Sequence, residues 1–106
     1  MPGGLLVEIT IKMTVRPQKR KELLLTFRDM IKTVREQKGC LGCMVCLDME
    51  HRYRLKLIGV WETQESLDDY MNTKLYSAML GAIRLLCTSY DTNINVIAYR
   101  YQQKQN

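Results

Sequence analysis

A chain of 106 residues is long enough for one domain with a modest core. Its hydrophobic fraction of 46% and charged fraction of 25% are ordinary for a globular protein and argue against a disordered one. No apolar run approaches the roughly 20 residues that span a bilayer, and the first residues lack the pattern of an export signal. We therefore expect one cytoplasmic domain over residues 1–106, with frayed ends at 1–4 and 102–106 and no membrane partner.

The net charge of +5 is concentrated in and beside one expected helix near the N-terminus. A basic stripe of this kind can bind nucleic acid or an anionic surface. No base-reading motif and no interleaved aromatic residues accompany the charges, which favours a solvated helix face. We expect no nucleic-acid partner, and a steep loss of affinity with salt would be the mark of the alternative.

Residues 5–15 alternate strictly between apolar and polar side chains, which predicts a half-buried strand. Pro17 then marks a helix start, and apolar residues recur at helical spacing as far as Val34. This pattern predicts a helix over residues 17–37. Gly39 ends it, because glycine takes the left-handed conformation that terminates many helices.

Two further strands are expected at residues 41–49 and 54–62, joined by a polar turn. Trp61, the only tryptophan, ends the second of them, and Thr63 is a good helix cap directly after it. Helical spacing then continues in two stretches divided at residues 72–73, and the second stretch ends near residues 88–89. The last strand is expected over residues 91–101.

The order strand, helix, strand, strand, helix, strand is that of the ferredoxin-like α+β fold. It predicts a four-stranded antiparallel sheet with helices on one face and Glu8 on the other. Large apolar patches are uncommon on the surface of monomers, so the second face needs a cover. A homodimer, sheet against sheet, supplies it. The apolar residues concerned include Leu6, Met44, Ile58 and Val60.

Three stretches resemble the antibiotic biosynthesis monooxygenase family: VRPQKRKELL, KGCLGCMVCLD, and VWETQESLDDYM with the following TKLYSAML. The third is similar to that family's Trp-Glu-Ser/Thr-x-Glu-x-Leu signature, and the resemblance extends from about residue 5 to residue 101. It implies a dimeric α+β barrel with a mainly apolar cavity in each subunit, between sheet and helices. It also implies a monooxygenase that oxidises quinol-like or polycyclic aromatic compounds with molecular oxygen, without cofactor or metal.

Two departures from the family pattern bear on the chemistry. Many members carry a histidine nine residues after the tryptophan and another near the following serine or threonine, where this chain has Tyr70 and Leu75. Haem-degrading relatives require an axial histidine on the second helical stretch, whereas the only histidine here is His51, in an expected solvated turn. Haem ligation is therefore disfavoured. A non-catalytic, dimeric small-molecule-binding or regulatory module of the same fold stays open as an alternative.

Trp61 and Tyr70 are the candidate catalytic residues. Trp61 either stacks on an aromatic substrate or is a core residue at a strand end. Tyr70 either donates a hydrogen bond to a substrate oxygen or packs in the core with its own hydroxyl group in contact with water. Tyr76 occupies a position that is usually phenylalanine in the family, which implies packing. The candidate substrate-binding residues are Trp61, Tyr70, Tyr76, Leu57, Ile11 and Phe27.

Cys40, Cys43 and Cys46 have the spacing C-x2-C-x2-C, which matches part of an iron–sulfur pattern. Alternation along a strand places Cys43 on the face opposite Cys46, whereas a cluster needs thiolates that converge. Cys87 lies far along the chain, on an expected helix. We therefore expect free thiols and no metal site.

Overall fold

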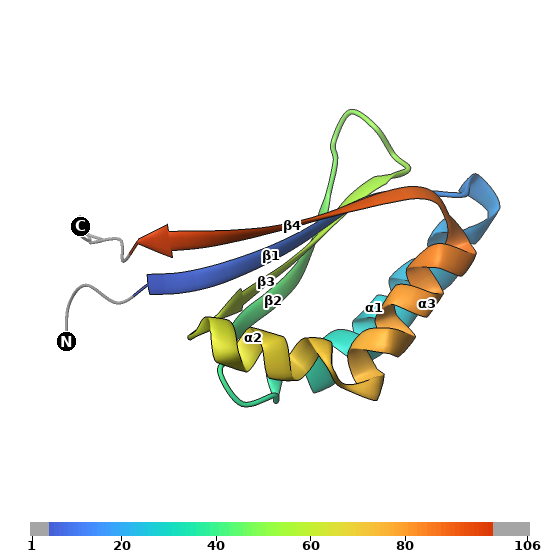
Figure 1. Ribbon diagram of the computed structural model, residues 1–106. Helices are drawn as coiled ribbons and strands as arrows, with labels where there is room; N and C mark the ends of the chain where they lie inside the picture. Colours follow the sequence, from blue (N-terminus) through green and yellow to red (C-terminus); the bar gives the residue numbers. More distant parts are fainter. Residues whose placement is uncertain (1–4, 99–106) are drawn as a thin grey trace, which may run out of the picture.

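The elements follow one another in the predicted order, as the computed structural model shows for residues 5–98 (Figure 1). The strands are β1 (Leu5–Val15), β2 (Cys40–Leu47), β3 (Arg54–Trp61) and β4 (Cys87–Ala98). The helices are a short 3-10 turn η1 (Pro17–Lys19), α1 (Arg20–Arg35), α2 (Gln64–Met71) and α3 (Lys74–Leu86). This is the predicted ferredoxin-like α+β fold. The expected strand end at 99–101 and the expected frayed termini lie outside the described residues.

The strands form one antiparallel sheet in the order β2-β3-β1-β4, and the helices lie along one face of it (Figure 1). The odd-numbered residues of β1 from Val7 to Val15 face the helices and are buried. Glu8 lies on the opposite face, as predicted. We call this face, on the side of the sheet away from the helices, the open face. None of the helices in residues 5–98 is long and apolar enough to cross a membrane.

The junction between α1 and β2 is held by Gly39. Its φ of +85° lies in the left-handed region that favours glycine, as predicted for this helix end. A Cβ atom at this position would overlap the side chain of Ser66, in the first turn of α2. The backbone N–H of Glu62 donates to the Gly39 carbonyl at 2.8 Å. The end of α1, the end of β3 and the start of α2 therefore meet at one point.

The prediction that the second helical stretch runs to residues 88–89 and carries Cys87 is wrong. α3 ends at Leu86, and Cys87 already has the extended backbone of β4 while its N–H donates to the Ile83 carbonyl. Cys87 pairs with Val15 of β1. The last helical residue, Leu86, and the first strand residue, Cys87, are both buried, so apolar spacing alone does not show where the backbone changes conformation.

Candidate functional site

Trp61 and Tyr70 are brought together by the cap of α2. The Thr63 hydroxyl accepts a hydrogen bond from the Ser66 N–H at 3.0 Å, and the Ser66 hydroxyl accepts one from the Thr63 N–H at 3.2 Å. This reciprocal capping box fixes where the helix starts after β3. Tyr70 consequently points back towards the sheet, where its ring stacks on Trp61 with a centroid distance of 4.7 Å and an interplanar angle of 21°.

Tyr76 completes an aromatic cluster with these two residues. Its ring meets Tyr70 edge-on, at a centroid distance of 5.2 Å and an angle of 71°. Thr73 positions it, because the Thr73 hydroxyl donates to the Tyr70 carbonyl at 2.6 Å and accepts from the Tyr76 N–H at 3.2 Å. Pairs of this geometry contribute about 0.5–1.5 kcal/mol each beyond the burial of their area. The cluster therefore packs as part of the core, between the sheet, α2 and α3.

A small enclosure lies beside the aromatic cluster, between the sheet and the helices. Five of the six candidate substrate-binding residues line it, and Phe27 does not, although it is buried elsewhere in the core. Its volume is about 10 Å³, which holds about one water molecule at most. An aromatic ligand would fit only after side chains have moved. The lining residues are Ile9, Ile11, Val34, Cys43, Leu57, Gly59, Trp61, Tyr70 and Tyr76.

The indole N–H of Trp61 is an unsatisfied donor in this enclosure. Trp61 is 0% exposed, and its Nε1 has no hydrogen-bond partner among residues 5–98. More than nine in ten buried polar groups in proteins are paired, and an unpaired one costs about 1–3 kcal/mol. The N–H lies over Gly59, 3.1 Å from where a Cβ atom of that residue would stand. An acceptor oxygen placed here would satisfy the donor.

The ionisable groups around the enclosure are held in their neutral forms. Burial is the main reason that the pKa of the Tyr70 hydroxyl lies above its ordinary value, and the neighbouring Cys43, Tyr76 and Cys40 groups raise it further. Burial, followed by the neighbouring Cys40, also raises the pKa of Cys43 to about 11. Tyr70 is therefore a hydrogen-bond donor at neutral pH, and Cys43 is not a thiolate nucleophile.

A surface groove of about 360 Å³ adjoins the aromatic cluster. Residues 37–39, the β3–α2 junction and α2 form its walls, and we call it the α2 groove. Tyr70 lines both this groove and the enclosure. The volume of the α2 groove lies within the range of about 300–1,000 Å³ that is usual for small-molecule pockets. The enclosure thus shares an aromatic wall residue with a space of ligand size.

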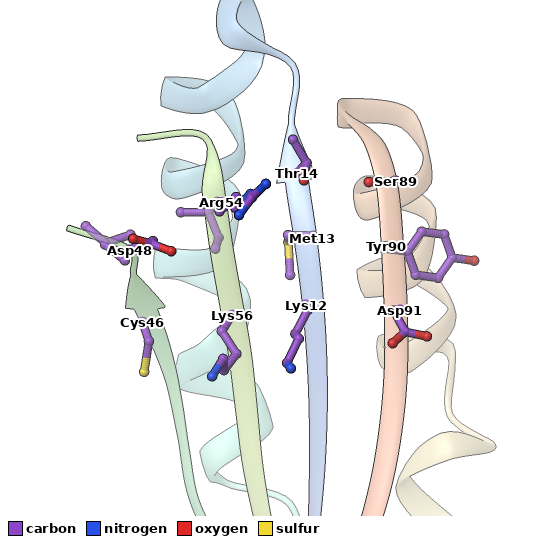
Figure 2. Close-up of a pocket in the computed structure, with 12 residues that line it drawn as sticks. Lys12, Met13, Thr14, Cys46, Asp48, Arg54, Lys56, Ser89, Tyr90 and Asp91 are labelled. Atoms are coloured by element: carbon purple, nitrogen blue, oxygen red, sulfur yellow. The ribbon is translucent and has the colours of Figure 1, made fainter. Parts of the chain in front are cut away.

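A larger groove, of about 570 Å³, lies at the other end of the sheet on the open face (Figure 2). Lys12 and Lys56 are direct partners across β1 and β3, and Figure 2 shows their side chains next to each other. Asp91 pairs with Lys12 from the other side. Among residues 5–98, no carboxylate lies within 4 Å of either ammonium group. Like charges directly opposed across strands are destabilising, so this groove is electrostatically unbalanced.

The cysteines do not converge on a site. Cys43 faces the helices and Cys46 the open face, as predicted, while a register irregularity between residues 40 and 42 brings Cys40 to the same face as Cys43. All four cysteines are free thiols. Within residues 5–98, no three histidine, cysteine or acidic side chains are grouped so that they could hold a metal ion. His51 is exposed in the β2–β3 turn, where its backbone N–H donates to the Asp48 carboxylate at 3.1 Å.

Sequence reasoning missed Gly59 and the α2 groove. A glycine inside a strand often marks a close approach, and Gly59 could have been found by that signal. The groove had no signal in any one segment, because it forms where three separate elements meet.

The profile of the antibiotic biosynthesis monooxygenase family matches residues 6–82, from β1 into α3. The chain belongs to this family. The matched range contains Trp61, Tyr70 and Tyr76, together with the rest of the enclosure. No curated protein sequence matches the chain.

Several solved structures share this fold at low sequence identity. A conserved protein from Methanosarcina mazei Go1 is 21% identical with a TM-score of 0.78, and the match covers 94% of each chain. A mutant of SnoaB, a cofactor-independent oxygenase from Streptomyces nogalater, is 14% identical with a TM-score of 0.76 and 95% coverage of each chain. A Mycobacterium tuberculosis protein is 19% identical with a TM-score of 0.76, covering 93% of this chain and 99% of that one. These likenesses show the fold alone.

Proposed function

We propose that the protein is a cofactor-independent monooxygenase that oxidises a quinol-like or polycyclic aromatic compound with molecular oxygen. The observation that carries the proposal is the buried Trp61 N–H, which has no partner among residues 5–98 and lies in the aromatic cluster, within the region that matches the family profile. SnoaB, which shares the fold, is described as a cofactor-independent oxygenase. In this proposal Trp61 donates to a substrate oxygen, and the rings of Trp61 and Tyr70 hold the substrate plane.

The reaction balances without an external reductant. An uncharged hydroquinone donates an electron and a hydroxyl proton to oxygen, one oxygen atom then becomes a hydroxyl group on the ring, and the other leaves as water. All four electrons come from the substrate, which becomes a hydroxyquinone. The protein's share is to bind the substrate, exclude water and hold protons in place. The Tyr70 hydroxyl keeps its proton at neutral pH and so acts as a donor to the substrate, together with the Trp61 indole.

The proposed assembly is a homodimer through the open faces of two sheets. Half-buried Leu6, Ile58 and Val60 and the 51% exposed Met44 lie on this face, where a second copy would cover them. Burial of apolar area is the main driving force for such association. In the dimer each subunit keeps its own enclosure, because the enclosure lies on the other side of its sheet.

Oxygen uptake tests the proposed activity. Chemically reduced naphthoquinols are supplied to the protein, and consumption is compared with the autoxidation background. We expect uptake above that background, reduced about tenfold or more in Trp61→Phe, because this variant keeps a ring and loses the donor. Uptake equal to the background across a panel of quinols, with Trp61→Phe indistinguishable from the wild type, would rule the oxygenase out.

A second candidate is a binding or regulatory module that has kept the fold without the chemistry. The observation in its favour is the pair Tyr70 and Leu75, which stand where many family members carry histidines. This candidate predicts saturable quenching of Trp61 fluorescence by an apolar aromatic ligand without oxygen consumption. A flat titration would count against it and against the oxygenase alike.

A further inference from the structure

The enclosure and the α2 groove share one lining residue. Tyr70 lines both spaces, and its ring lies between Trp61 and Tyr76. The enclosure holds no more than about one water molecule, whereas the groove has about 360 Å³. A displaced Tyr70 ring would join the two spaces and expose the Trp61 N–H to a molecule in the groove. The groove is thus the short route to the buried donor.

The α2 groove is acidic. Glu62, Glu65 and Asp69 line it and are exposed, against one basic residue, Lys38. None of the three carboxylates lies within 4 Å of a basic group among residues 5–98. Glu65 in the first turn of α2 also stabilises the helix dipole. That explanation does not extend to Glu62 before the cap or Asp69 in the second turn.

The two spaces exclude opposite charges. The acidic groove repels an anion, since unpaired carboxylates raise the free energy of a negative ligand near them. The enclosure is lined mainly by apolar side chains, so a cation that passed the groove would lose its hydration without gaining a counter-ion. An uncharged molecule meets neither penalty. The Trp61 N–H adds one requirement, an acceptor oxygen on the molecule.

We infer that the α2 groove is the entrance to the site, that the Tyr70 ring is its movable wall, and that Glu62, Glu65 and Asp69 select uncharged aromatic compounds with an acceptor oxygen over anionic ones. This inference rests on the proposed function and deepens it, because it names the charge class of the substrate. The donor in the enclosure and the acid-lined groove are independent observations that point to the same ligand.

A matched pair of quinones tests the selection. 2-(Hydroxymethyl)anthraquinone is uncharged, and anthraquinone-2-sulfonate is an anion of similar size. Both have blocked ring positions and so do not add to thiols. Quenching of Trp61, the only tryptophan, reports binding of each. We expect the uncharged compound to bind about tenfold more tightly at low salt, and the ratio to fall as salt shortens the screening length from about 30 Å to about 8 Å.

A triple variant tests the contribution of the three carboxylates in the α2 groove. In Glu62→Gln/Glu65→Gln/Asp69→Asn we expect sulfonate affinity to rise severalfold and affinity for the uncharged compound to change less than twofold. The control Glu22→Gln/Asp29→Asn/Glu50→Gln removes three exposed carboxylates outside the groove and changes the net charge equally. It should leave the ratio as in the wild type. Equal effects of the two triple variants would overturn the inference, because net charge alone would then explain the preference.

The movable wall is tested by association rates. Tyr70→Leu removes the ring from between the two spaces and should speed association of the uncharged compound about tenfold, while Tyr70→Phe keeps the ring and stays near the wild-type rate. An unchanged rate in a folded Tyr70→Leu would overturn the gate, and if that variant does not fold, the exposed charge variants still decide the inference. Equal quenching by both quinones refutes the selection alone. Quenching by neither refutes the proposed function as well.

Discussion

The two faces of the sheet differ in the polar groups that have no partner among residues 5–98. The covered face, over which the helices lie, is mainly apolar, and its one buried side-chain group without a hydrogen-bond partner among residues 5–98 is the Trp61 N–H. The open face is broad and mixed. Half-buried apolar residues lie at one end, and the larger groove at the other end contains Lys12 and Lys56, which have no carboxylate within 4 Å among residues 5–98. The larger hollow is therefore on the face that suits a partner protein. The smaller one has the directed donor that a small ligand needs.

The largest expected difference between the faces is in stability. Trp61→Ala removes a fully buried indole from the covered face and should lower the free energy of unfolding by about 3–5 kcal/mol. Lys56→Ala on the open face should change it by less than about 0.5 kcal/mol. Urea unfolding followed by circular dichroism measures both. Similar losses in the two variants would mean that Trp61 is not the centre of the core.

The second prediction concerns assembly. Ile58→Lys places a charge in the apolar part of the open face and should weaken the dimer by about 100-fold or more, because an unpaired ammonium group would be buried. Leu85→Lys on α3 is the control, since Leu85 is 73% exposed and on the helix side. Sedimentation over a concentration series gives the dissociation constants. A monomeric wild type, or a dimer that only Leu85→Lys weakens, would refute the proposed interface.

The third prediction compares two glycines on opposite faces. A Cβ atom at Gly59 would lie 3.1 Å from Trp61 Nε1 and 3.2 Å from Ile9 Cγ2, whereas nothing lies within 4 Å of one at Gly42. Gly59→Ala should therefore destabilise by about 1–3 kcal/mol through overpacking. Gly42→Ala should be neutral or stabilising by up to about 1 kcal/mol. Thermal unfolding of both variants tests the difference, and a neutral Gly59→Ala would show that the enclosure has room to relax.

The smallest effect is a pH dependence. The pKa of Cys43 rises to about 11 from its ordinary 9.0, mainly through burial. Between pH 9 and pH 11 the folded thiol keeps its proton while the unfolded thiol loses it. The contribution of Cys43 to the free energy of unfolding is therefore complete below pH 9 and is lost as the pH rises towards 11. Cys87, whose pKa burial also raises to about 11, adds to the fall. The urea midpoint at pH 8 and pH 10.5 measures it. In Cys43→Ala the fall should be smaller, and an identical fall would assign it to other groups.

The sequence predicted the sheet and its faces well, because strict alternation in β1 has only one interpretation. It also predicted Thr63 as the cap of α2, which the capping box confirms. The α3–β4 boundary was missed because Cys87 is buried in either conformation. Five candidate binding residues share the enclosure, but its small volume depends on how Tyr70 and Trp61 stack. No local sequence pattern predicts such contacts between side chains that are distant in the sequence.

The indole N–H resonance of Trp61 gives the most direct test of the covered face as the ligand site. The chain has one tryptophan, so its ¹⁵N-labelled form has one indole cross-peak. On titration with 2-(hydroxymethyl)anthraquinone, we predict a saturable downfield shift of this peak as its N–H gains an acceptor, with smaller changes on the open face. An unmoved indole peak, with saturable shifts at Lys12 and Lys56 instead, would contradict the account and assign ligand binding to the open face.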